Sequence, residues 1–195
     1  MDLRRAHVAP VSLWAAGFGV FVMDVRECEV PSTSALGREL VGNADFHDSW
    51  RAPLVHPDLA MVDLFFALFG HTPLWMKLLL ISRNWAARRF GLEAPSVAEI
   101  MKPEVRSSYR VGDKVGPWPI FFMDDNELVA GRDNKHMDFR LSVLKVRDGS
   151  AADVVVSTVC TVHNVFGKIY LFCIVPFHRH GVQSLMSRAV AAKRL

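Results

Sequence analysis

Residues 136–163 read HMDFRLSVLKVRDGSAADVVVSTVCTVH, and this stretch decides the fold. It contains two long runs rich in β-branched and other apolar residues, 136–147 and 153–163, separated by Asp148, Gly149 and Ser150. A connection this short joins only antiparallel neighbours, so the stretch predicts a β-hairpin. Two shorter runs precede it, 119–123 and 127–132, again with brief polar connections. Together the four runs predict an antiparallel meander.

A strand and a helix are predicted before the meander. Residues 45–53 alternate enough for a strand, which stops at Pro53 because proline cannot donate to a sheet ladder. Asp58 is placed to cap a helix whose apolar residues recur at helical spacing over 61–69, and Gly70 ends it.

A second helix and a further strand are expected between that helix and the meander. Thr72 is placed as the cap, Pro73 falls in the first turn, and the apolar pattern continues to Gly91. We expect a strand through 107–111 to lead into a loop at 112–119.

The chain from Asn164 onward fits either a buried strand over 169–175 or a long helix. The helix is favoured because Asn164 is a good N-cap and because an apolar stripe continues past Pro176 to the basic terminus. That stripe consists of Phe166, Tyr170, Cys173 or Ile174, Phe177, Gly181 and Leu185. Pro176 should kink the helix, since its ring removes one helical hydrogen bond. The order of elements predicts an α+β fold in which this helix lies across the sheet.

Composition is typical of a single globular domain. The chain has 195 residues, of which 51% are apolar and 22% charged, enough for a substantial core. The formal charge of +3 gives no basic excess of the kind that nucleic-acid binding requires. Cys28, Cys160 and Cys173 make an odd count without Cys-x-x-Cys spacing, which argues against disulfides and a thiolate zinc site. We therefore expect a reducing compartment, the cytoplasm.

Residues 1–22 form an apolar extension to a single domain over 23–195. Arg4 and Arg5 precede the apolar run 11–23, which is too short to cross a bilayer as a helix and is followed by no cleavage site. Three interpretations stay open: a loosely packed extension with Met23 as the true start, a membrane-surface anchor, or a packed helix. A membrane-surface anchor would make the protein membrane-associated through residues 11–23.

Six motifs, in order, resemble one bacterial family. They are Ala44-Asp45-Phe46, VGDKVGPWPI at 111–120, ELVAG at 127–131, HMDFRLS at 136–142, HNxxGKxY at 163–170 and PFHR at 176–179. The chain resembles the bacterial domain of unknown function 2867, which is itself similar to the START-like (SRPBCC, polyketide cyclase-like) helix-grip superfamily.

The resemblance implies a curved antiparallel sheet that grips the C-terminal helix around an apolar cavity. Such scaffolds hold lipids, polyketides and other hydrophobic small molecules, so it implies binding of such a molecule, without a cofactor and with no particular reaction. Related domains are sometimes fused behind a short-chain dehydrogenase-like module, which implies a functional link to a protein of that kind.

One face of the 136–147 strand carries the residues best suited to catalysis. His136, Asp138 and Arg140 are two apart and share that face, while the apolar residues between them point to the other. If the polar face lines a cavity, His136 and Asp138 are placed for general acid–base catalysis of a cyclase or hydratase type, with Arg140 or Tyr170 stabilising an oxyanion. If it faces outward, it is the solvated side of an antiparallel sheet.

Further candidates for contacting a ligand each have a structural alternative. His163 either shuttles protons or bonds a turn carbonyl, and Tyr170 is either a cavity donor or a core tyrosine. Trp118, on a stiff loop, either gates the cavity or packs. The pair His178 and Arg179 either reaches a ligand head group or covers the helix surface. No metal site is predicted. His136 and Asp138 could supply two ligands, but a third would depend on strand register that the sequence does not determine.

Overall fold

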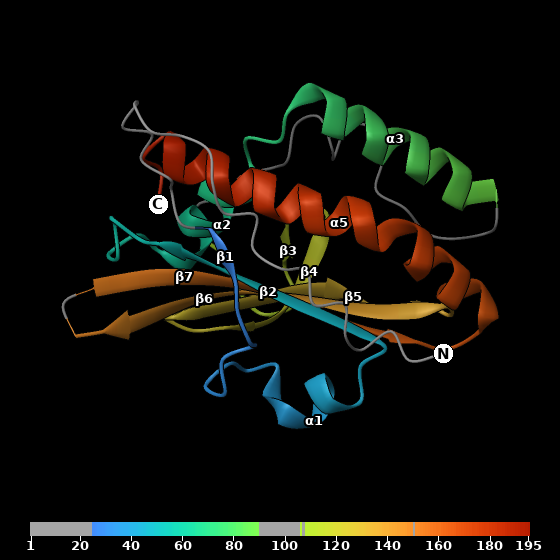
Figure 1. The fold of residues 1–195 in the computed structure, drawn as a ribbon, viewed down its shortest axis with the longest axis horizontal. Helices are drawn as coiled ribbons and strands as arrows, with labels where there is room; N and C mark the ends of the chain where they lie inside the picture. Colours follow the sequence, from blue (N-terminus) through green and yellow to red (C-terminus); the bar gives the residue numbers. More distant parts are fainter. Residues whose placement is uncertain (1–24, 90–105, 107, 150) are drawn as a thin grey trace, which may run out of the picture.

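The computed structural model describes residues 25–89, 106, 108–149 and 151–195. Its centre is a seven-stranded sheet, antiparallel at every pairing, with the strand order β1-β2-β7-β6-β5-β4-β3 (Figure 1). The strands are β1 (Arg26–Glu27), β2 (Phe46–Pro53), β3 (Lys114–Val115), β4 (Trp118–Met123), β5 (Glu127–Arg132), β6 (Met137–Asp148) and β7 (Ala151–Val162). The extension at 1–22 lies outside the described residues.

The central hairpin confirms the prediction made from residues 136–163. β6 and β7 have twelve residues each and pair from Asp148 with Ala151 to Met137 with Val162. Gly149 turns the chain with a φ of +60°, a conformation that favours glycine. β4 and β5 extend the meander on one side of the hairpin as predicted, and β2 pairs with β7 on the other.

One predicted strand is wrong. Residues 108–110 form no strand, and the partner of β4 is instead β3, which lies beyond Gly112. Gly112 has a φ of +94° and donates its N–H to the carbonyl of Ile120. The chain turns at this glycine, so only the residues after it run alongside β4.

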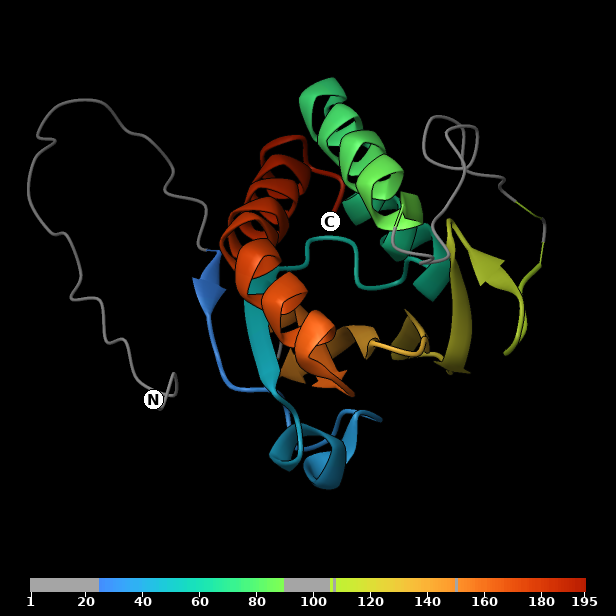
Figure 2. The same ribbon diagram turned by 90° about the vertical axis from the view of Figure 1, so that its right-hand side faces the viewer.

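Within the described part of the chain, helices cover both faces of the sheet (Figures 1 and 2). They are α1 (Gly37–Gly42), α2 (Met61–Phe69), α3 (Leu74–Arg89) and α5 (Val165–Ala191). α5 lies across one face, with α2 and α3 on the same side, whereas α1 lies against the other face (Figure 2). α1 is the helix that the sequence did not predict.

The predicted helices α2 and α3 are present, but both predicted caps are wrong. Ala60 caps α2 in an extended conformation without a side-chain hydrogen bond, so Asp58 does not serve as the cap. The hydroxyl of Thr72 donates to the carbonyl of Phe69 at 2.7 Å, at the end of α2, and the first hydrogen bonds of α3 go to the carbonyl of Pro73. The predicted C-terminal end of α3 lies outside the described residues.

α5 confirms the helical interpretation of the C-terminal segment. The Asn164 side chain caps it by accepting from the N–H of Gly167 at 3.1 Å, and the helix continues through Pro176. The predicted inward stripe is correct only in part, because Leu185 is buried but Phe177 is 58% exposed. The first half of α5 is apolar on two sides, so helical periodicity alone does not select the side that meets the sheet.

The main core fills the space between the sheet and the helices α2 and α5. Leu64, Phe65 and Met186 are at most 2% exposed and pack with the inward residues of the central strands. A smaller cluster on the other face joins Leu36, just before α1, to Val129 of β5. A seven-stranded antiparallel sheet with a long C-terminal helix across it is consistent with a helix-grip-like fold.

Candidate functional site

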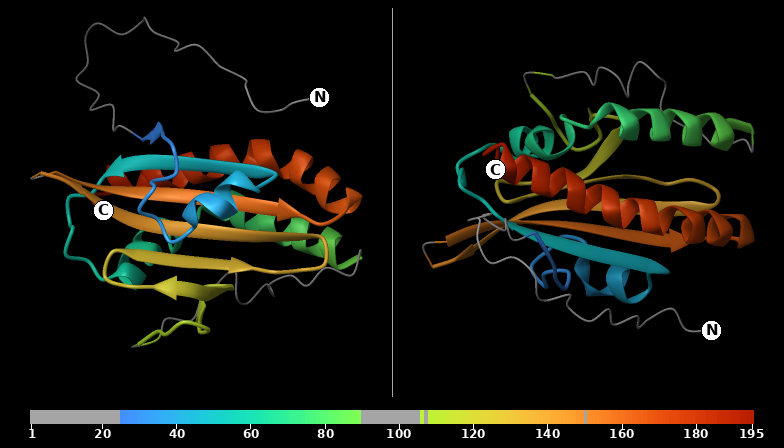
Figure 3. Two further views of the ribbon diagram at one scale, coloured as in Figure 1. Left: turned by 90° about the horizontal axis from the view of Figure 1, so that it is seen from below. Right: turned by 45° about the horizontal axis from the view of Figure 1, so that its top comes forward.

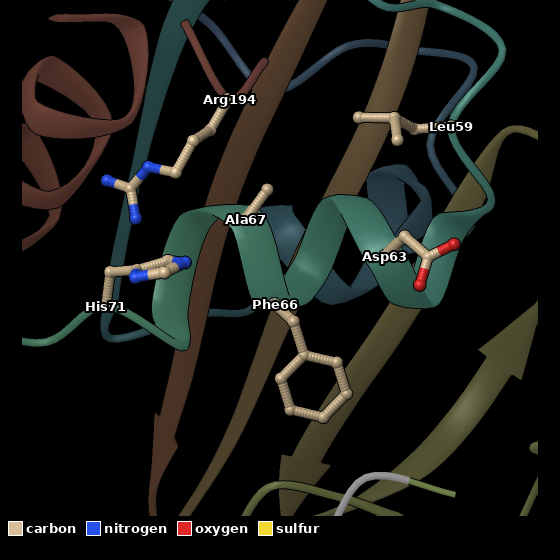
Figure 4. Close-up of a pocket in the computed structure, with 6 residues that line it drawn as sticks. All are labelled: Leu59, Asp63, Phe66, Ala67, His71 and Arg194. Carbon is tan, nitrogen blue, oxygen red and sulfur yellow. The ribbon is translucent and has the colours of Figure 1, made fainter. Parts of the chain in front are cut away.

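An open surface pocket of about 340 Å³ lies along the less buried side of α2. Its lining consists of Leu59, Asp63, Phe66, Ala67, His71 and Arg194 (Figure 4). Leu59, Asp63, Ala67 and His71 are spaced four residues apart and Phe66 precedes Ala67, which places the five along one side of the helix and at its two ends. Arg194 joins them from the other end of the chain, just after α5.

The end of α5 determines where Arg194 points. Lys193 adopts a φ of +51°, and the N–H of Arg194 donates to the carbonyl of Ala189 at 3.0 Å, the pattern of a Schellman motif. Leu195 is then buried in the main core, and its carbonyl accepts from the N–H of Val55 at 3.0 Å. Because the backbone is held on both sides of Arg194, its side chain extends toward α2 (Figure 4).

The two basic residues of the pocket lie beside each other at one end (Figure 4). Nε of Arg194 is buried and has no hydrogen-bond partner among the residues described. Burial, and then the charge of Arg188, lowers the pKa of Arg194. Burial, and then the charge of Arg194, lowers the pKa of His71. This end of the pocket therefore carries positive charge, which suits an anionic acceptor.

The rest of the pocket is apolar apart from Asp63. The ring of Phe66 packs against those of Phe65 and Tyr109, with centroids 5.9 and 6.4 Å apart, and these contacts hold it in place. Leu59 and Asp63 lie toward the end of α2 away from His71 (Figure 4). An apolar wall with one cationic end fits a small molecule that has an apolar body and an anionic group.

The predicted polar face of β6 lies on the side of the sheet away from α5. Leu141 packs in the main core beneath the helices, so strand alternation points Asp138 and Arg140 to the opposite face. Ser142 shares that face, and its hydroxyl donates at 2.5 Å to Glu127, which also binds the segment before α1. This face of β6 therefore lies away from α5, and part of it is buried beneath the segment before α1.

Asp138 and Arg140 each have a partner of their own. Oδ2 of Asp138 lies 2.9 Å from Nε2 of His163, and the two side chains are 33% and 40% exposed. Arg140 forms an ion pair with Asp133, and its guanidinium lies 3.6 Å from the centroid of the Phe121 ring. The structure thus brings Asp138 together with His163.

His136 lies where the start of β6 meets the start of α5. Its Nδ1 is 3.1 Å from Oδ1 of Asn164, the cap of α5, and its ring centroid is 4.8 Å from that of Phe166. Its Nε2 is buried and has no hydrogen-bond partner within the described residues. His136 therefore contacts α5, whereas Asp138, two residues later, contacts the end of β7.

The structure brings His178 to a carboxylate that we did not single out from the sequence. Asp48 of β2 is buried beneath α5, with Oδ1 3.1 Å from Nε2 of His178, and its Oδ2 accepts from Nε1 of Trp50 at 3.3 Å. Arg179 lies 3.8 Å from Glu27 of β1. These contacts tie α5 to the first two strands. Asp48 shares the strand face of the core residue Trp50, which is the signal that could have identified it.

Trp118 and Tyr170 both pack among apolar side chains, and Trp118 is the first residue of β4 rather than part of a loop. The ring of Trp118 lies edge-on to those of Phe65 and Phe139, with centroids 6.2 and 5.8 Å apart. Tyr170 packs against a smaller apolar cluster that contains Leu171. Neither residue lines the pocket beside α2.

The thiol of Cys160 is chemically inert. Burial, together with the charges of Asp48 and Asp45, raises its pKa to about 12, so it stays protonated at neutral pH. Among the side chains that the structure describes, no group of three His, Cys, Asp or Glu residues is placed to hold a metal ion.

The basic end of the pocket was missed by reasoning from the sequence. His71 follows the glycine that ends α2, and Arg194 belongs to a basic terminus of the kind that favours a helix dipole. No local motif joins the two residues, because their proximity depends on how α5 crosses the sheet.

Comparison with known proteins yields one family. The model described as "Protein of unknown function (DUF2867)" matches residues 40–185, well over half of the chain. The matched range contains α2 and most of α5, while Arg194 lies beyond it. No curated protein and no solved structure matches the chain.

Proposed function

Since the chain belongs to the DUF2867 family, which is described only as being of unknown function, we propose a function from the pocket: the protein binds a small molecule with an apolar body and an anionic group beside α2. The START-like resemblance supports the proposal, because such scaffolds hold lipid- or polyketide-like molecules. The resemblance implied a ligand between the sheet and α5. Core side chains such as Phe65 and Met186 occupy that space, so we propose the pocket beside α2 instead.

The observation that carries the proposal is the cationic end of the pocket, where the half-buried side chain of Arg194 lies beside His71 (Figure 4). A carboxylate placed there would accept charge-assisted hydrogen bonds from the guanidinium, and such bonds are stronger than those between neutral groups. Leu59, Phe66 and Ala67 would then contact the apolar body of the ligand.

The size of the pocket narrows the class of ligand. A volume of about 340 Å³ is near the lower end of the range of small-molecule sites. It suits a medium-chain fatty acid or a single-ring aromatic acid better than a long-chain lipid held along its whole length.

Calorimetric titration of the full chain with octanoate tests the proposal. Arg194→Met should weaken octanoate binding at least about tenfold, because it removes the donor that faces the anionic group. Arg38→Met is the matched control, since it removes an equal charge from an exposed position on α1, on the other face of the sheet, and it should change affinity by less than about threefold. Equal losses in the two variants would show that only the general charge matters and would overturn the assigned site.

A neutral analogue separates the two halves of the proposed ligand. Octanol presents the same apolar body without the anionic group, so it should bind the native protein more weakly than octanoate does. The affinity for octanol should be the same in Arg194→Met as in the native protein. Octanol that binds as tightly as octanoate would restrict the proposal to an apolar ligand.

A second candidate function rests on the Asp138–His163 pair. A solvent-accessible imidazole 2.9 Å from a carboxylate is an arrangement that supports proton transfer, as a cyclase or hydratase would need. Exchange of the α-protons of small ketones in deuterated water, followed by NMR, tests it. Exchange that is faster with the native protein than with His163→Gln would support an enzyme, and equal rates would remove this candidate.

A further inference from the structure

The pocket beside α2 has opposite charges at its two ends. Asp63 lies at the end where α2 begins, and His71 and Arg194 lie at the end where it finishes (Figure 4). Arg194 reaches that end because α5 ends beside α2 (Figures 1 and 3). The proposed function uses only the basic end, so the acidic end bears on the other end of the ligand.

The carboxylate of Asp63 is available to a ligand. Asp63 is exposed, and among the residues that the structure describes it makes no hydrogen bond and no ion pair. Its place in the first turn of α2 favours a carboxylate, because the helix dipole is positive there. That effect leaves both oxygens of Asp63 able to accept from a donor that enters the pocket.

A lysine near this end of the pocket is already engaged. Nζ of Lys145 donates to the carbonyl of Leu59 at 2.5 Å, and the acidic neighbours whose charges act on it are Asp58 and Asp125. Within the described ranges no cation is paired with Asp63. The acidic end of the pocket therefore fits a cationic group that a ligand brings with it.

The row of residues from Asp63 to His71 sets the distance between the charged ends. Asp63, Ala67 and His71 recur every four residues, so Ala67 lies midway along the row. At 1.5 Å per residue, the two ends are about 12 Å apart along α2. Because the side chain of Ala67 is a single methyl group, an extended ligand can lie over it and reach both ends.

A linear chain of eight carbons matches this distance. An extended chain advances by about 1.2 Å per bond, so a carboxyl carbon and a nitrogen on the eighth carbon are about 10 Å apart. A hydrogen bond of about 2.8 Å at each end adds to the span.

We propose that the pocket selects linear ω-amino carboxylic acids of about eight carbons, with the ammonium group at Asp63 and the carboxylate at Arg194 and His71. This inference rests on the proposed function, because it uses the same pocket and the same basic end. An ion pair in an open pocket is screened by water and salt, so Asp63 contributes selectivity between ligands and a smaller part of the affinity.

A zwitterionic lipid headgroup is a poorer match. Its phosphate and ammonium groups are four bonds apart, about 5 Å, which is less than half of the distance along α2. Among the described residues no single helix is long and apolar enough to cross a membrane, and α2 with Leu74–Ser82 reaches that length only as a pair bent by 92°. We expect glycerophosphocholine not to compete with 8-aminooctanoate, and competition at equal concentration would overturn the assigned length.

Calorimetric titration of the full chain with three eight-carbon ligands tests the proposal. We expect 8-aminooctanoate to bind tightest, 8-hydroxyoctanoate less tightly and octanedioate weakest, because their far groups are cationic, neutral and anionic. The affinities for the first and the last should differ by about fivefold.

Two variants assign this preference to one residue. Asp63→Asn should bring the affinities for 8-aminooctanoate and octanedioate to within about twofold of each other. Asp58→Asn is the matched control, since it removes an equal charge from an exposed position near the start of α2 that does not line the pocket. It should keep at least about a threefold preference.

Octanoate, which tests the proposed function, separates the two proposals. If octanoate binds but 8-aminooctanoate binds no more tightly than octanedioate, the inference is wrong and the proposed function stands. If none of the four ligands binds, both are wrong. A preference that survives Asp63→Asn, or that Asp58→Asn also removes, would overturn the role of Asp63. Melting curves that match the native protein would show that both variants are folded.

Discussion

At the scale of single residues, the buried carboxylate of Glu127 joins the α1 segment to the sheet. Its Oε1 accepts from the hydroxyls of Ser34 and Ser142 at 2.6 and 2.5 Å, and its Oε2 accepts from the N–H of Ala35 at 2.7 Å. Glu127 is only 3% exposed, so protein donors replace the water that would otherwise solvate its charge.

Removing Glu127 should therefore destabilise the fold. Glu127→Ala leaves two hydroxyls and one backbone N–H without their acceptor, and we expect a loss of about 3 kcal/mol in the free energy of unfolding. Urea denaturation measures it. Asp125→Ala, at an exposed position two residues earlier, should stay within about 0.5 kcal/mol of the native protein. A loss below about 1 kcal/mol for Glu127→Ala would contradict the structural role.

The proposed function predicts that ligand affinity depends on pH through the protonation of His71. Its pKa is lowered in the free protein, so the imidazole is neutral at pH 7. A carboxylate bound beside it would stabilise the protonated form and raise this pKa, so binding takes up a proton. Octanoate affinity should then increase as the pH falls from about 8 through the usual histidine range near 6.5. Calorimetry over this range measures the slope, which His71→Asn should remove; a flat native profile would contradict the coupling.

At the scale of elements, α5 approaches the sheet most closely at its first turn. A Cβ on Gly167 would lie 2.2 Å from the carbonyl oxygen of His136, so no side chain fits there unless the helix moves. That carbonyl also accepts from the N–H of His163 at 2.9 Å. The start of α5 is thereby fixed against the start of β6 and the end of β7.

Gly167→Ala should destabilise the protein although alanine is the better helix former. Propensity alone would add about 1 kcal/mol of stability, whereas forcing the helix away from the backbone of β6 costs about 1–3 kcal/mol. We expect a lower melting temperature. Gly42→Ala is the control, because nothing lies within 4 Å of its Cβ position, and it should be neutral or stabilising. A stabilised Gly167→Ala variant would contradict the close approach.

At the scale of the whole molecule, the described residues from Val25 onward supply seven strands of the sheet and helices on both of its faces. Val25 packs against the main core, β1 pairs with β2, and Leu195 is buried at the other end. Deleting residues 1–22 should therefore leave a folded domain whose free energy of unfolding changes by less than about 1 kcal/mol. Melting curves of the two chains test this, and a loss above about 2 kcal/mol, typical of lost core burial, would show that the extension packs into the fold.

The sequence by itself determined the local elements. The runs of β-branched and apolar residues at 136–147 and 153–163, with Asp148 and Gly149 between them, define a hairpin, and Asn164 defines the start of α5. Each signal is complete within a few neighbouring residues, because side-chain period and turn conformation are local properties. The α2 cap failed because Ala60 begins that helix with its backbone alone. α1 has only six residues and no side-chain cap, which leaves a weak signal.

Only the tertiary structure decided which side each element presents. Alternation grouped Asp138 with Arg140, but the packing of Leu141 beneath the helices put that group on the outer face. α5 has two apolar sides, and only its docking on β2 and α2 leaves Phe172 in solvent. His71 and Arg194 meet because α5 ends beside α2. Such contacts depend on how segments that are distant in the sequence pack together. The residues that neighbour His71 or Arg194 in the sequence therefore do not predict the contact between them.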